Sequence, residues 1–459
     1  MANSQASDAV LTRALAARPT PRQLAWQRLE YIAFAHFGIN TFTDREWGDG
    51  AEDPALFNPT EFDADQWVAA CCDAGMKLLI LTAKHHDGFC LWPSAHTEHS
   101  VKNSPWRAGG GDVVAEVSAA CARAGLKFGV YCSPWDRHEA CYGDSPAYNA
   151  FFCAQLRELL SNYGPIAEVW FDGACGEGPN GKRQEYDWAS YYALARQLQP
   201  EAAIAICGPD VRWVGNESGL ARDDEWSVVA GPRGADKNGV ALLEVDNGAK
   251  DLGSRDNLSQ GEACFWYPAE CDVSIRPGWF YHAAQDLQVK SLSHLLDIYY
   301  RSVGRNSVLL LNVPPDRRGL FHENDVARLR ELRAALDATF AEDLARGAEG
   351  GGAAVDGAWD SYWTAPSEED VLTLDLGAEA TFDRLLVQEF IEEGQRVERF
   401  VLEGWHDGAW KEIVRGGCIG YQRLERFSRI TVRRVRLRIE ASRAPALLRR
   451  VGLFLSAEA

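Results

Sequence analysis

Short apolar runs that end in polar side chains recur along this chain, and no other feature constrains its fold as strongly. Residues 32–35 lead into His36, residues 78–81 into a Lys-His-His-Asp stretch, and residues 169–171 into Asp172. Each run is too short for a helix and is rich in Val, Ile, Leu and Phe, which is typical of a buried strand. We therefore interpret the runs as buried strands whose ends carry titratable groups.

Predicted helices alternate with these strands. The helical patterns cover residues 64–74, 112–124, 150–163 and 186–198. In the second of them Asp112 is the expected N-cap, and Gly125 is the expected stop. Helix–strand alternation predicts a parallel sheet, and polar groups at its carboxyl ends are how a (β/α)8 barrel builds an active site. Because the alternation weakens after Cys207, we expect a (β/α)8-like barrel with an irregular second half.

A second unit is expected after the barrel. Residues 324–345 form a charge-rich amphipathic pattern without proline, and the Gly-rich residues 347–352 have the composition of a flexible linker. Beyond them, short alternating runs recur at intervals of about 10 residues, which is typical of an antiparallel β-sandwich. We predict a catalytic domain over residues 1–346 and a β-sandwich over residues 353–459.

Composition narrows the classes of partner and compartment. The formal charge of −19 disfavours nucleic acid and anionic membranes, and no apolar run is long enough to span a bilayer. The twelve cysteines include no CxxC pair, and most lie within apolar patterns as small buried thiols. Since no secretory signal is visible at the N-terminus, we expect a reducing, cytoplasmic location.

Two carboxylates could carry hydrolytic chemistry. Asp172 ends a strand within Trp-Phe-Asp-Gly, and Glu217 lies in a Gly- and Asn-containing loop. A carboxylate pair is what glycosidic bond cleavage requires, and in retaining enzymes the two groups lie about 5–5.5 Å apart. From position alone, Asp172 could equally cap a turn and Glu217 could be a solvated loop residue.

Histidines and tryptophans indicate a polar, aromatic-lined site. Adjacent His85 and His86 could suggest a metal, but neighbouring strand residues point in opposite directions, and neither HxH nor HExxH is present. We favour recognition of sugar hydroxyls and expect no metal or cofactor. Several tryptophans fall in predicted loops, where indoles could stack on sugar faces: Trp47, Trp92, Trp135, Trp213, Trp226, Trp266 and Trp279.

Five motifs, in order, closely resemble glycoside hydrolase family 29, the α-L-fucosidases. They are HFGINTFTDREWGDG (36–50), KHHDGFCLW (84–92), WFDG (170–173), SIRPGWFYH (274–282) and SVLLLNVPPDRRGL (307–320). The resemblance covers about residues 25–340. It implies a barrel with some helices missing and a retaining, metal-independent mechanism. The C-terminal part resembles the galactose-binding-like sandwich of the subfamily that cleaves α-1,3 and α-1,4 linkages.

The resemblance also assigns roles. Asp172 matches the nucleophile, and Glu217 looks like the general acid/base, with Glu225 and Glu270 as reserve candidates for that role. The positions implied to bind the sugar are His36, Glu46, Trp47, His85, His86, Tyr131, Arg276 and Trp279. The expected activity is release of terminal fucose from Lewis-type fucosylated oligosaccharides or glycoconjugates. The loops 173–182 and 221–260 are expected to set the aglycone preference.

Three alternatives remain open at this point. The first is a metal-dependent barrel hydrolase that uses His85, His86 and Asp172. The second is a non-catalytic glycan-binding protein, which the presence of both Asp172 and Glu217 disfavours. The third is a hydrolase of α-L-galactosides, which share the fucose configuration and add a hydroxyl at C6.

Overall fold

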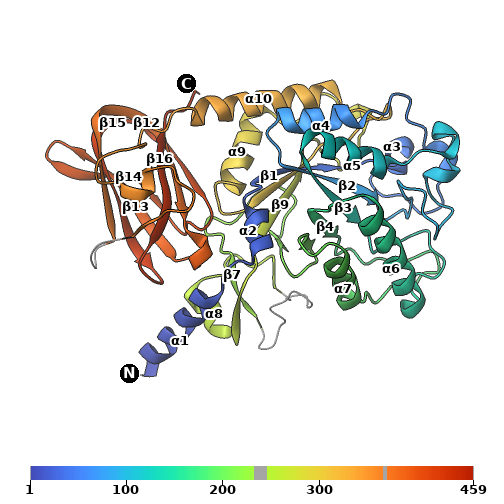
Figure 1. Cartoon of the computed structure of the whole chain (residues 1–459), viewed down its shortest axis with the longest axis horizontal. Helices are drawn as coiled ribbons and strands as arrows, with labels where there is room; N and C mark the ends of the chain where they lie inside the picture. The colour runs from blue at the N-terminus through green and yellow to red at the C-terminus, as the bar shows by residue number, and fades with distance from the viewer. Residues whose placement is uncertain (1, 232–244, 365–369, 458–459) are drawn as a thin grey trace.

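The computed structural model describes residues 2–231, 245–364 and 370–457, and places a barrel beside a β-sandwich (Figure 1). The predicted loop 221–260 lies in part, at residues 232–244, outside the described residues, as do residues 365–369 and 458–459 of the predicted sandwich. Helix α10 (Glu323–Phe340) runs along one side of the barrel towards the sandwich (Figure 1).

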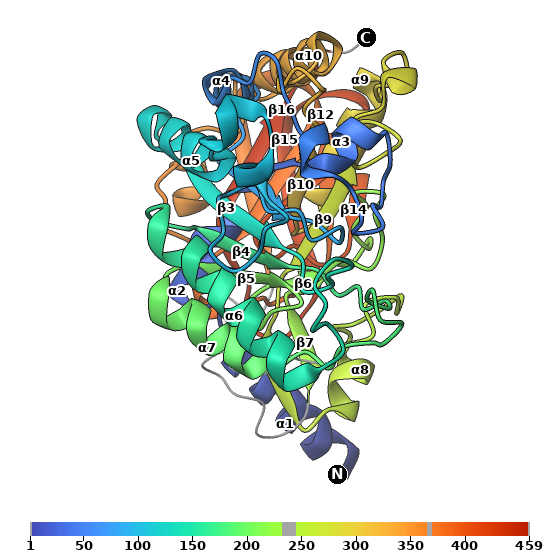
Figure 2. The same cartoon turned by 90° about the vertical axis from the view of Figure 1, so that its right-hand side faces the viewer.

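The barrel is a nearly closed sheet of eight strands, which confirms the predicted fold class. In sheet order the strands are β5 (Ala203–Ile206), β4 (Glu168–Phe171), β3 (Lys127–Cys132), β2 (Leu78–Lys84), β1 (Tyr31–Ala35), β10 (Val308–Asn312), β9 (Ala269–Ser274) and β6 (Arg212–Trp213). All seven ladders are parallel. Their carboxyl ends therefore meet at one rim. Figure 2 shows the barrel strands in the middle, with α5, α6 and α7 along their left side.

Helices cover the outside of this sheet, and the outward-facing side chains of the strands are apolar because they pack against these helices. They are α4 (Ala64–Asp73), α5 (Val113–Ala124), α6 (Ser145–Asn162), α7 (Trp188–Leu198), α9 (Leu292–Ser302) and α10, with the short α3 (Ile39–Thr43) after β1. Helix α2 (Pro21–Gln27) lies instead at the amino-terminal ends of the strands, where its Trp26 packs with interior side chains such as Ile32 and Phe34. In α5 the Asp112 side chain accepts from the Ala115 N–H and Gly125 adopts a left-handed conformation, so both predicted ends are confirmed. Strands β1 and β2 are buried along their whole length, as expected of a sheet covered on both faces.

The second half of the barrel is irregular, as predicted, but it holds more strands than the sequence indicated. Beyond Cys207, where the helix–strand alternation of the sequence weakens, lie β6, the antiparallel pair β7 (Val228–Gly231) and β8 (Ala263–Trp266), helix α8 (Arg255–Gln260) and β9. Among the described residues, β5 and β6 form no ladder, and a single bridge joins Cys207 to Arg212. The barrel therefore has one open seam. Strand β9 escaped prediction because its sequence, AECDVS, is not an apolar run.

The C-terminal unit is antiparallel throughout. Its strands are β11 (Trp363–Thr364), β12 (Val371–Glu389), β13 (Val397–His406), β14 (Ala409–Gly416), β15 (Arg423–Ser442) and β16 (Leu447–Phe454). Strands β12 and β15, with 19 and 20 residues, are much longer than the short runs predicted from the sequence. Register shifts within their ladder let each strand bend and continue. The short 3₁₀ helices are η1 (Pro54–Leu56), η2 (Val101–Asn103), η3 (Trp106–Gly109), η4 (Ala283–Gln285), η5 (Gly352–Val355) and η6 (Ile391–Glu393).

The Gly-rich segment before the sandwich is folded onto it. The Glu349 N–H donates to the Asp375 carbonyl at 3.1 Å, and the Asp375 N–H returns the bond at 3.0 Å. Ala345 and Ala354, which flank the segment, are buried in the sandwich core. The expectation of a flexible linker over 347–352 was therefore wrong. Composition alone could not reveal that these backbone groups pair with β12.

The sandwich and the barrel share an apolar contact. Tyr300 of α9 packs with Leu386, Leu424 and Phe454 of the sandwich. A second cluster joins the N-terminal helix α1 (Ala2–Ala16) and the β7–β8 pair to the sandwich, through Val10, Ala14, Val228, Trp266, Ile391 and Tyr421 among others. The Tyr421 hydroxyl also donates to Glu30 Oε1 at 2.7 Å. The two units are therefore packed against each other.

An acidic pair lies inside the barrel. Glu168 on β4 and Glu270 on β9 are fully buried and lie against each other. The Trp26 indole donates to Glu168 at 2.8 Å, and the Trp170 indole donates to Glu270 at 2.7 Å. Burial raises the pKa of Glu168 to about 7, and burial together with Glu168 raises the pKa of Glu270 further. The pair therefore holds a proton at neutral pH.

This pair predicts a pH-dependent stability. The folded-state pKa of Glu168 is about 7 against an ordinary 4.5, so the stabilisation is complete below about pH 4.5 and is lost as pH rises through 7. Glu168→Gln retains an acceptor for Trp26 and a donor for Glu270 without a titrating proton. We expect the thermal midpoint of this variant to exceed that of the wild type by about 2 °C at pH 8 and to match or fall below it at pH 5.

The control for this prediction is Glu185→Gln, which makes the same substitution at an exposed position. Thermal unfolding of all three proteins at both pH values checks the prediction. If the difference in thermal midpoint between Glu168→Gln and the wild type is the same at pH 5 and at pH 8, the prediction is contradicted.

Candidate active site

Asp172 lies at the rim directly after β4, where two donors hold its carboxylate. The Tyr131 hydroxyl donates to Oδ2 at 3.0 Å, and the Ala174 N–H donates to Oδ1 at 2.7 Å. Both bonds orient the carboxylate. The side chain is 25% exposed, so the carboxylate is fixed and still accessible. A positioned and accessible carboxylate of this kind can act as a nucleophile.

His86 lies beside Asp172 as a neutral imidazole with a defined tautomer. Its Nε2 is 3.7 Å from Asp172 Oδ2, and burial lowers its pKa below the usual range. Its Nδ1 is 2.7 Å from the Ser133 hydroxyl, which itself donates to the Trp135 carbonyl. Ser133 must therefore accept from Nδ1–H, which leaves the Nε2 lone pair facing the site. A sugar hydroxyl can donate to this lone pair.

His36 is held in the same way at the end of β1. Asn312, the last residue of β10, accepts from the His36 N–H at 3.1 Å, and its Oδ1 lies 2.8 Å from His36 Nδ1. The Asn312 amide group donates to Ser274 and to the Trp279 carbonyl, so its oxygen is the acceptor and Nδ1 carries the proton. Burial lowers the pKa of His36 to about 3, which leaves a neutral ring with a free Nε2.

Ring contacts link the expected sugar-binding residues into one wall. His85 stacks on Tyr131 with ring centres 5.8 Å apart and lies 4.1 Å from His86. Burial lowers the pKa of His85 well below its usual value, so a third neutral imidazole joins this wall. His36 lies 5.1 Å from the Trp279 ring. The structure thus brings five of the expected residues together.

Trp279 connects this wall to Glu217. Its indole N–H donates to Glu217 Oε2 at 3.3 Å, and its backbone N–H donates to Glu46 Oε2 at 2.8 Å. Glu217 is exposed on the loop that follows β6. The Gly219 N–H of this loop donates to the Asp272 carbonyl at 3.2 Å. An exposed carboxyl at the rim can exchange protons with water, as a general acid/base must.

Two of the seven expected loop tryptophans, besides Trp279, contribute to the site. Trp47 is 58% exposed and its ring contacts His86 and Trp135. Trp135 in turn lies 4.8 Å from His86. Trp213 donates to the buried Asp272 at 2.8 Å. The remaining three are almost fully buried and serve packing: Trp92, Trp226 and Trp266.

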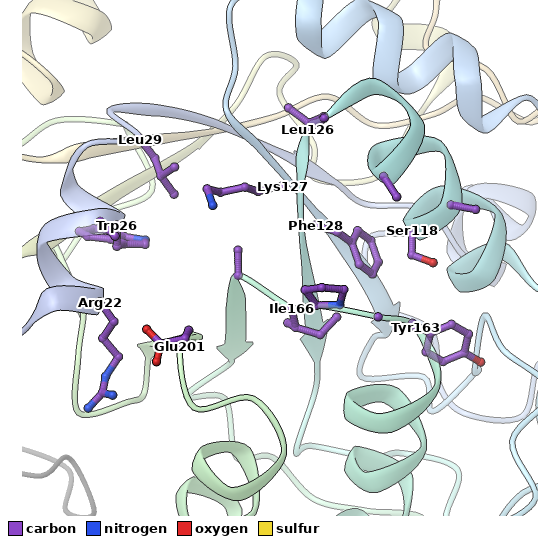
Figure 3. A pocket seen from close by; sticks show the side chains of 17 residues that line it. Arg22, Trp26, Leu29, Ser118, Leu126, Lys127, Phe128, Tyr163, Ile166 and Glu201 are labelled. Carbon is purple, nitrogen blue, oxygen red and sulfur yellow. The ribbon is translucent and has the colours of Figure 1, made fainter.

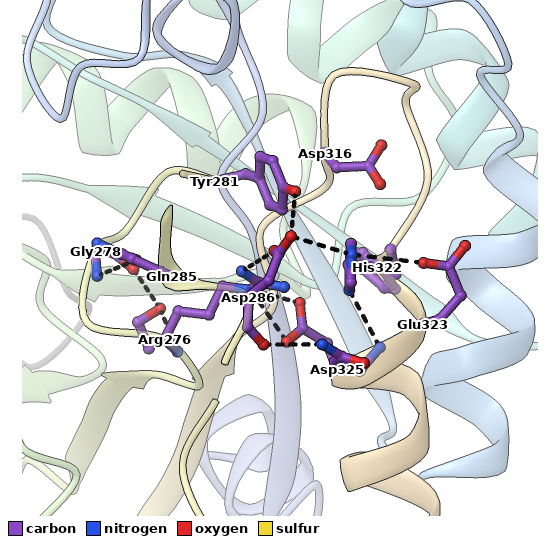
Figure 4. Close-up of polar contacts among 12 residues, drawn as sticks. Arg276, Gly278, Tyr281, Gln285, Asp286, Asp316, His322, Glu323 and Asp325 are labelled. Atoms are coloured by element: carbon purple, nitrogen blue, oxygen red, sulfur yellow. Dashed lines mark hydrogen bonds and ion pairs between the residues drawn. The ribbon is translucent and has the colours of Figure 1, made fainter. Parts of the chain in front are cut away.

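Arg276 is placed differently from the other expected residues. Its guanidinium is fully buried, with both oxygens of Asp325 on Nε and Asp286 on Nη1 at 2.8 Å (Figure 4). It also lies over the Tyr281 ring at 4.8 Å. Among the described residues, this guanidinium forms no hydrogen bond or ion pair with the other expected sugar-binding side chains. Its observed contacts join the β9–α9 loop to helix α10.

The reserve carboxylates are enclosed. Both oxygens of Glu225 are bonded, one to Arg212 and the other to Arg222, and the residue is 1% exposed. Glu270 belongs to the buried pair inside the barrel. Glu217 is therefore the better placed of the three to meet a substrate.

A separate cavity of about 600 Å³ lies at the opposite end of the strands (Figure 3). Trp26, Leu29, Phe128 and Ile166 line it, at the amino-terminal ends of β3 and β4. It is therefore distinct from the rim that carries Asp172. Among the described residues no group of three or more His, Cys, Asp or Glu is arranged to hold a metal ion. In the same described parts, no helix is long and apolar enough to cross a bilayer.

Sequence reasoning missed the residues that hydrogen-bond to the site histidines and hold them in place. Asn312 follows the apolar run of β10 as His36 follows that of β1, so the same signal was present. Ser133 follows β3 directly and carried a similar signal. Asp44 and His282, by contrast, lie in loops and become visible only through their contact in the fold.

Comparison with known proteins agrees with this geometry. The family model described as alpha-L-fucosidase matches residues 22–338, and that of the F5/8 type C domain matches residues 338–451. The Alpha-L-fucosidase 1 of Arabidopsis thaliana is 43% identical over 458 residues, which cover 95% of this chain and 87% of that protein.

Solved structures are similar over nearly the whole chain. A putative alpha-L-fucosidase from Bacteroides ovatus is 50% identical with a TM-score of 0.91, over 99% of this chain and 76% of that one. A GH29 fucosidase from Ruminococcus gnavus in complex with fucose is 33% identical with a TM-score of 0.85, over 96% and 95% of the two chains. The chain belongs to glycoside hydrolase family 29 and is an α-L-fucosidase.

Proposed function

We propose that this fucosidase is a retaining exo-enzyme in which Asp172 attacks the anomeric carbon and Glu217 serves as general acid/base. The observation that carries the proposal is the fixed carboxylate of Asp172, which accepts from the Tyr131 hydroxyl and the Ala174 N–H beside the His86 ring. Glu217 lies on a different loop of the same rim, in contact with Trp279. Two carboxylates on separate loops can flank a glycosidic bond.

The proposed reaction has two steps. Asp172 displaces the aglycone and forms a covalent fucosyl ester, while Glu217 gives its proton to the departing oxygen. Glu217 then takes a proton from water, which attacks the anomeric carbon and releases Asp172. Two inversions give net retention. The alternative of a lectin is disfavoured because both carboxyls are present and accessible.

We propose that the neutral imidazoles bind sugar hydroxyls. His36 and His86 each carry their proton on Nδ1, so their Nε2 atoms accept from hydroxyl groups. Exposed Trp47 offers an apolar face for the sugar ring. Glu46, His85, Tyr131 and Trp279 complete this set, and Arg276 is retained as a proposed contributor through the loop that it anchors. An aspartate-to-alanine variant of the Ruminococcus gnavus enzyme is also described in complex with fucose.

The proposed natural substrates are Lewis-type glycans with α-1,3- or α-1,4-linked terminal fucose. Support comes from the position of Glu217 in the loop after β6, which matches the subfamily that the sequence resembles. We also propose a reducing, cytoplasmic location, since all twelve cysteines carry unpaired thiols and five of them are buried in the barrel.

The nucleophile assignment predicts a near-total loss of activity in Asp172→Ala, by roughly a thousandfold or more in kcat. Added azide should restore part of the turnover and give the β-fucosyl azide, because a single displacement inverts the anomeric centre. Product analysis by NMR measures this. The control is Asp337→Ala on the exposed face of α10, which should remain fully active. Near wild-type turnover in Asp172→Ala would refute the assignment.

The acid/base assignment predicts a loss that depends on the leaving group. Glu217→Ala should lower kcat/KM about a hundredfold on an oligosaccharide but less than tenfold on an activated aryl fucoside, which needs little protonation. Kinetics on both substrates check this, with Glu185→Gln as an exposed carboxylate control. Equal losses on the two substrates would remove Glu217 from the acid role.

The linkage assignment predicts strong fucose release from a Lewis-type trisaccharide and weaker release from an α-1,2-fucosylated one. Fucose is measured directly, with an aryl α-L-fucoside and an aryl α-L-galactoside run alongside. If fucose is released from the aryl fucoside alone, the fucosidase activity stands, but the assignment to α-1,3 and α-1,4 linkages is wrong. Faster cleavage of the galactoside would favour the hydrolase of α-L-galactosides.

A further inference from the structure

His282 is held between two carboxylates that come from another loop. Its Nδ1 lies 2.7 Å from Asp44 Oδ1, and its Nε2 lies 2.6 Å from Glu46 Oε1. Asp44 and Glu46 belong to the segment after α3, whereas His282 belongs to the loop between β9 and α9. One imidazole ring therefore joins two loops of the rim.

The geometry requires the ring to be cationic. A carboxylate only accepts hydrogen bonds, so each ring nitrogen must carry a hydrogen to bond its partner. A neutral imidazole has one N–H and could satisfy only one of the two carboxylates. Asp44 and Glu46 are the titratable groups that face the ring. With charge on both sides, these bonds are of the strong, charge-assisted kind.

The bond to Glu46 reaches the catalytic rim in one further step. Glu46 accepts from the Trp279 N–H at 2.8 Å and from the Phe280 N–H at 3.2 Å, and its side chain is still 37% exposed. The Trp279 indole donates to Glu217. The Glu46 carboxylate packs closely against the backbone of Gly278, because a Cβ added at Gly278 would lie 2.4 Å from Glu46 Oε1. Displacement of Glu46 would therefore disturb Trp279.

We propose that His282 is a positioning residue, whose imidazolium fixes Glu46 and, through Glu46, the Trp279 indole that contacts Glu217. This inference deepens the proposed function and rests on it for its kinetic readout. In the described part of the chain, the His282 ring bonds to Asp44 and Glu46 and not to Asp172 or Glu217, so it acts through Glu46. Its loss should weaken sugar binding more than it slows the chemical step.

The arrangement also gives the site a pH dependence. Burial lowers the pKa of His282, but the hydrogen bonds and charges of Asp44 and Glu46 outweigh it, and the net shift is upward from 6.5. Below that raised pKa both N–H groups are present and Glu46 is held. As pH rises through it, one N–H is lost and a lone pair faces a carboxylate. We expect KM to rise on this alkaline side.

The test uses two variants and one control. Asp44→Asn keeps an oxygen acceptor for Nδ1–H and removes the charge, and Asn tolerates the left-handed backbone at this position, where φ is 59°. His282→Gln removes the cation. His294→Gln makes the same change at an exposed site on α9 and should match the wild type. All are assayed from pH 5 to 9 on an activated aryl fucoside, which reduces the dependence on the protonation of Glu217.

We expect His282→Gln to raise KM at pH 6 about fivefold to tenfold while kcat changes less than about threefold, and to abolish the alkaline rise of KM. Asp44→Asn should move that rise to lower pH by about half a unit or more. If His282 had a merely structural role, the variants would lose activity, but the pH at which KM rises would not move. If KM of Asp44→Asn rises at the same pH as KM of the wild type, the proposal is overturned.

Histidine-selective NMR titration provides a readout that does not need hydrolysis. The chain has ten histidines, and the His282→Gln spectrum identifies the His282 signal by its absence. We expect His282 to titrate above 6.5 in the wild type and lower in Asp44→Asn. Titration at or below 6.5 in the wild type would overturn the inference. Failure of the proposed mechanism would leave this titration unchanged, so the two failures are distinguishable.

Discussion

The register of the parallel ladders determines where each side chain of the site lies. Strand β1 pairs with β10 so that Phe34 lies opposite Asn312, which places His36 just beyond the last pair and within reach of the Asn312 side chain. Strand β3 pairs with β4 so that Tyr131 lies opposite Trp170, and Asp172 follows two residues later. A slip of one residue would turn every side chain of a strand to the other face. The backbone bonds thus fix the site before any side chain meets a sugar.

Burial then decides which protonation states the site can hold. Removing an imidazole from water disfavours its charged form, and the rings of His36, His85 and His86 are all buried. His282 differs because two carboxylates flank it and compensate for its burial. One rim therefore contains histidines of opposite character. The neutral ones are proposed to accept from sugar hydroxyls, while the charged one joins two loops.

The sequence predicted best what a strand end determines. His36, Tyr131 and Asp172 each follow or end an apolar run, and parallel pairing brought them to one rim. The same logic should have included Asn312, which ends the run of β10. It could not identify β9, because that strand carries Glu270 and Asp272 towards the interior and so lacks an apolar pattern.

Long-range partners were beyond the reach of pattern reasoning. Arg276 follows β9 at the position expected of a rim residue, yet Asp325 of α10 draws its guanidinium into a buried ion pair. No pattern in the sequence around Arg276 predicts an ion pair with a carboxylate 49 residues away. The Gly-rich segment before the sandwich misled for a similar reason. Its composition suggested freedom, and its backbone bonds to Asp375 could be seen only in three dimensions.

The open seam of the barrel has a consequence for how such enzymes can diversify. Strand β6 is only two residues long and pairs with β9 alone, while a single bridge crosses to Cys207. The loop that bears Glu217 begins at this seam. Insertions or deletions there would break few ladder bonds, whereas the same changes beside β4 would shift the register that places Asp172. The barrel therefore holds the strand before Asp172 in a fixed register and leaves the loop of Glu217 open to remodelling.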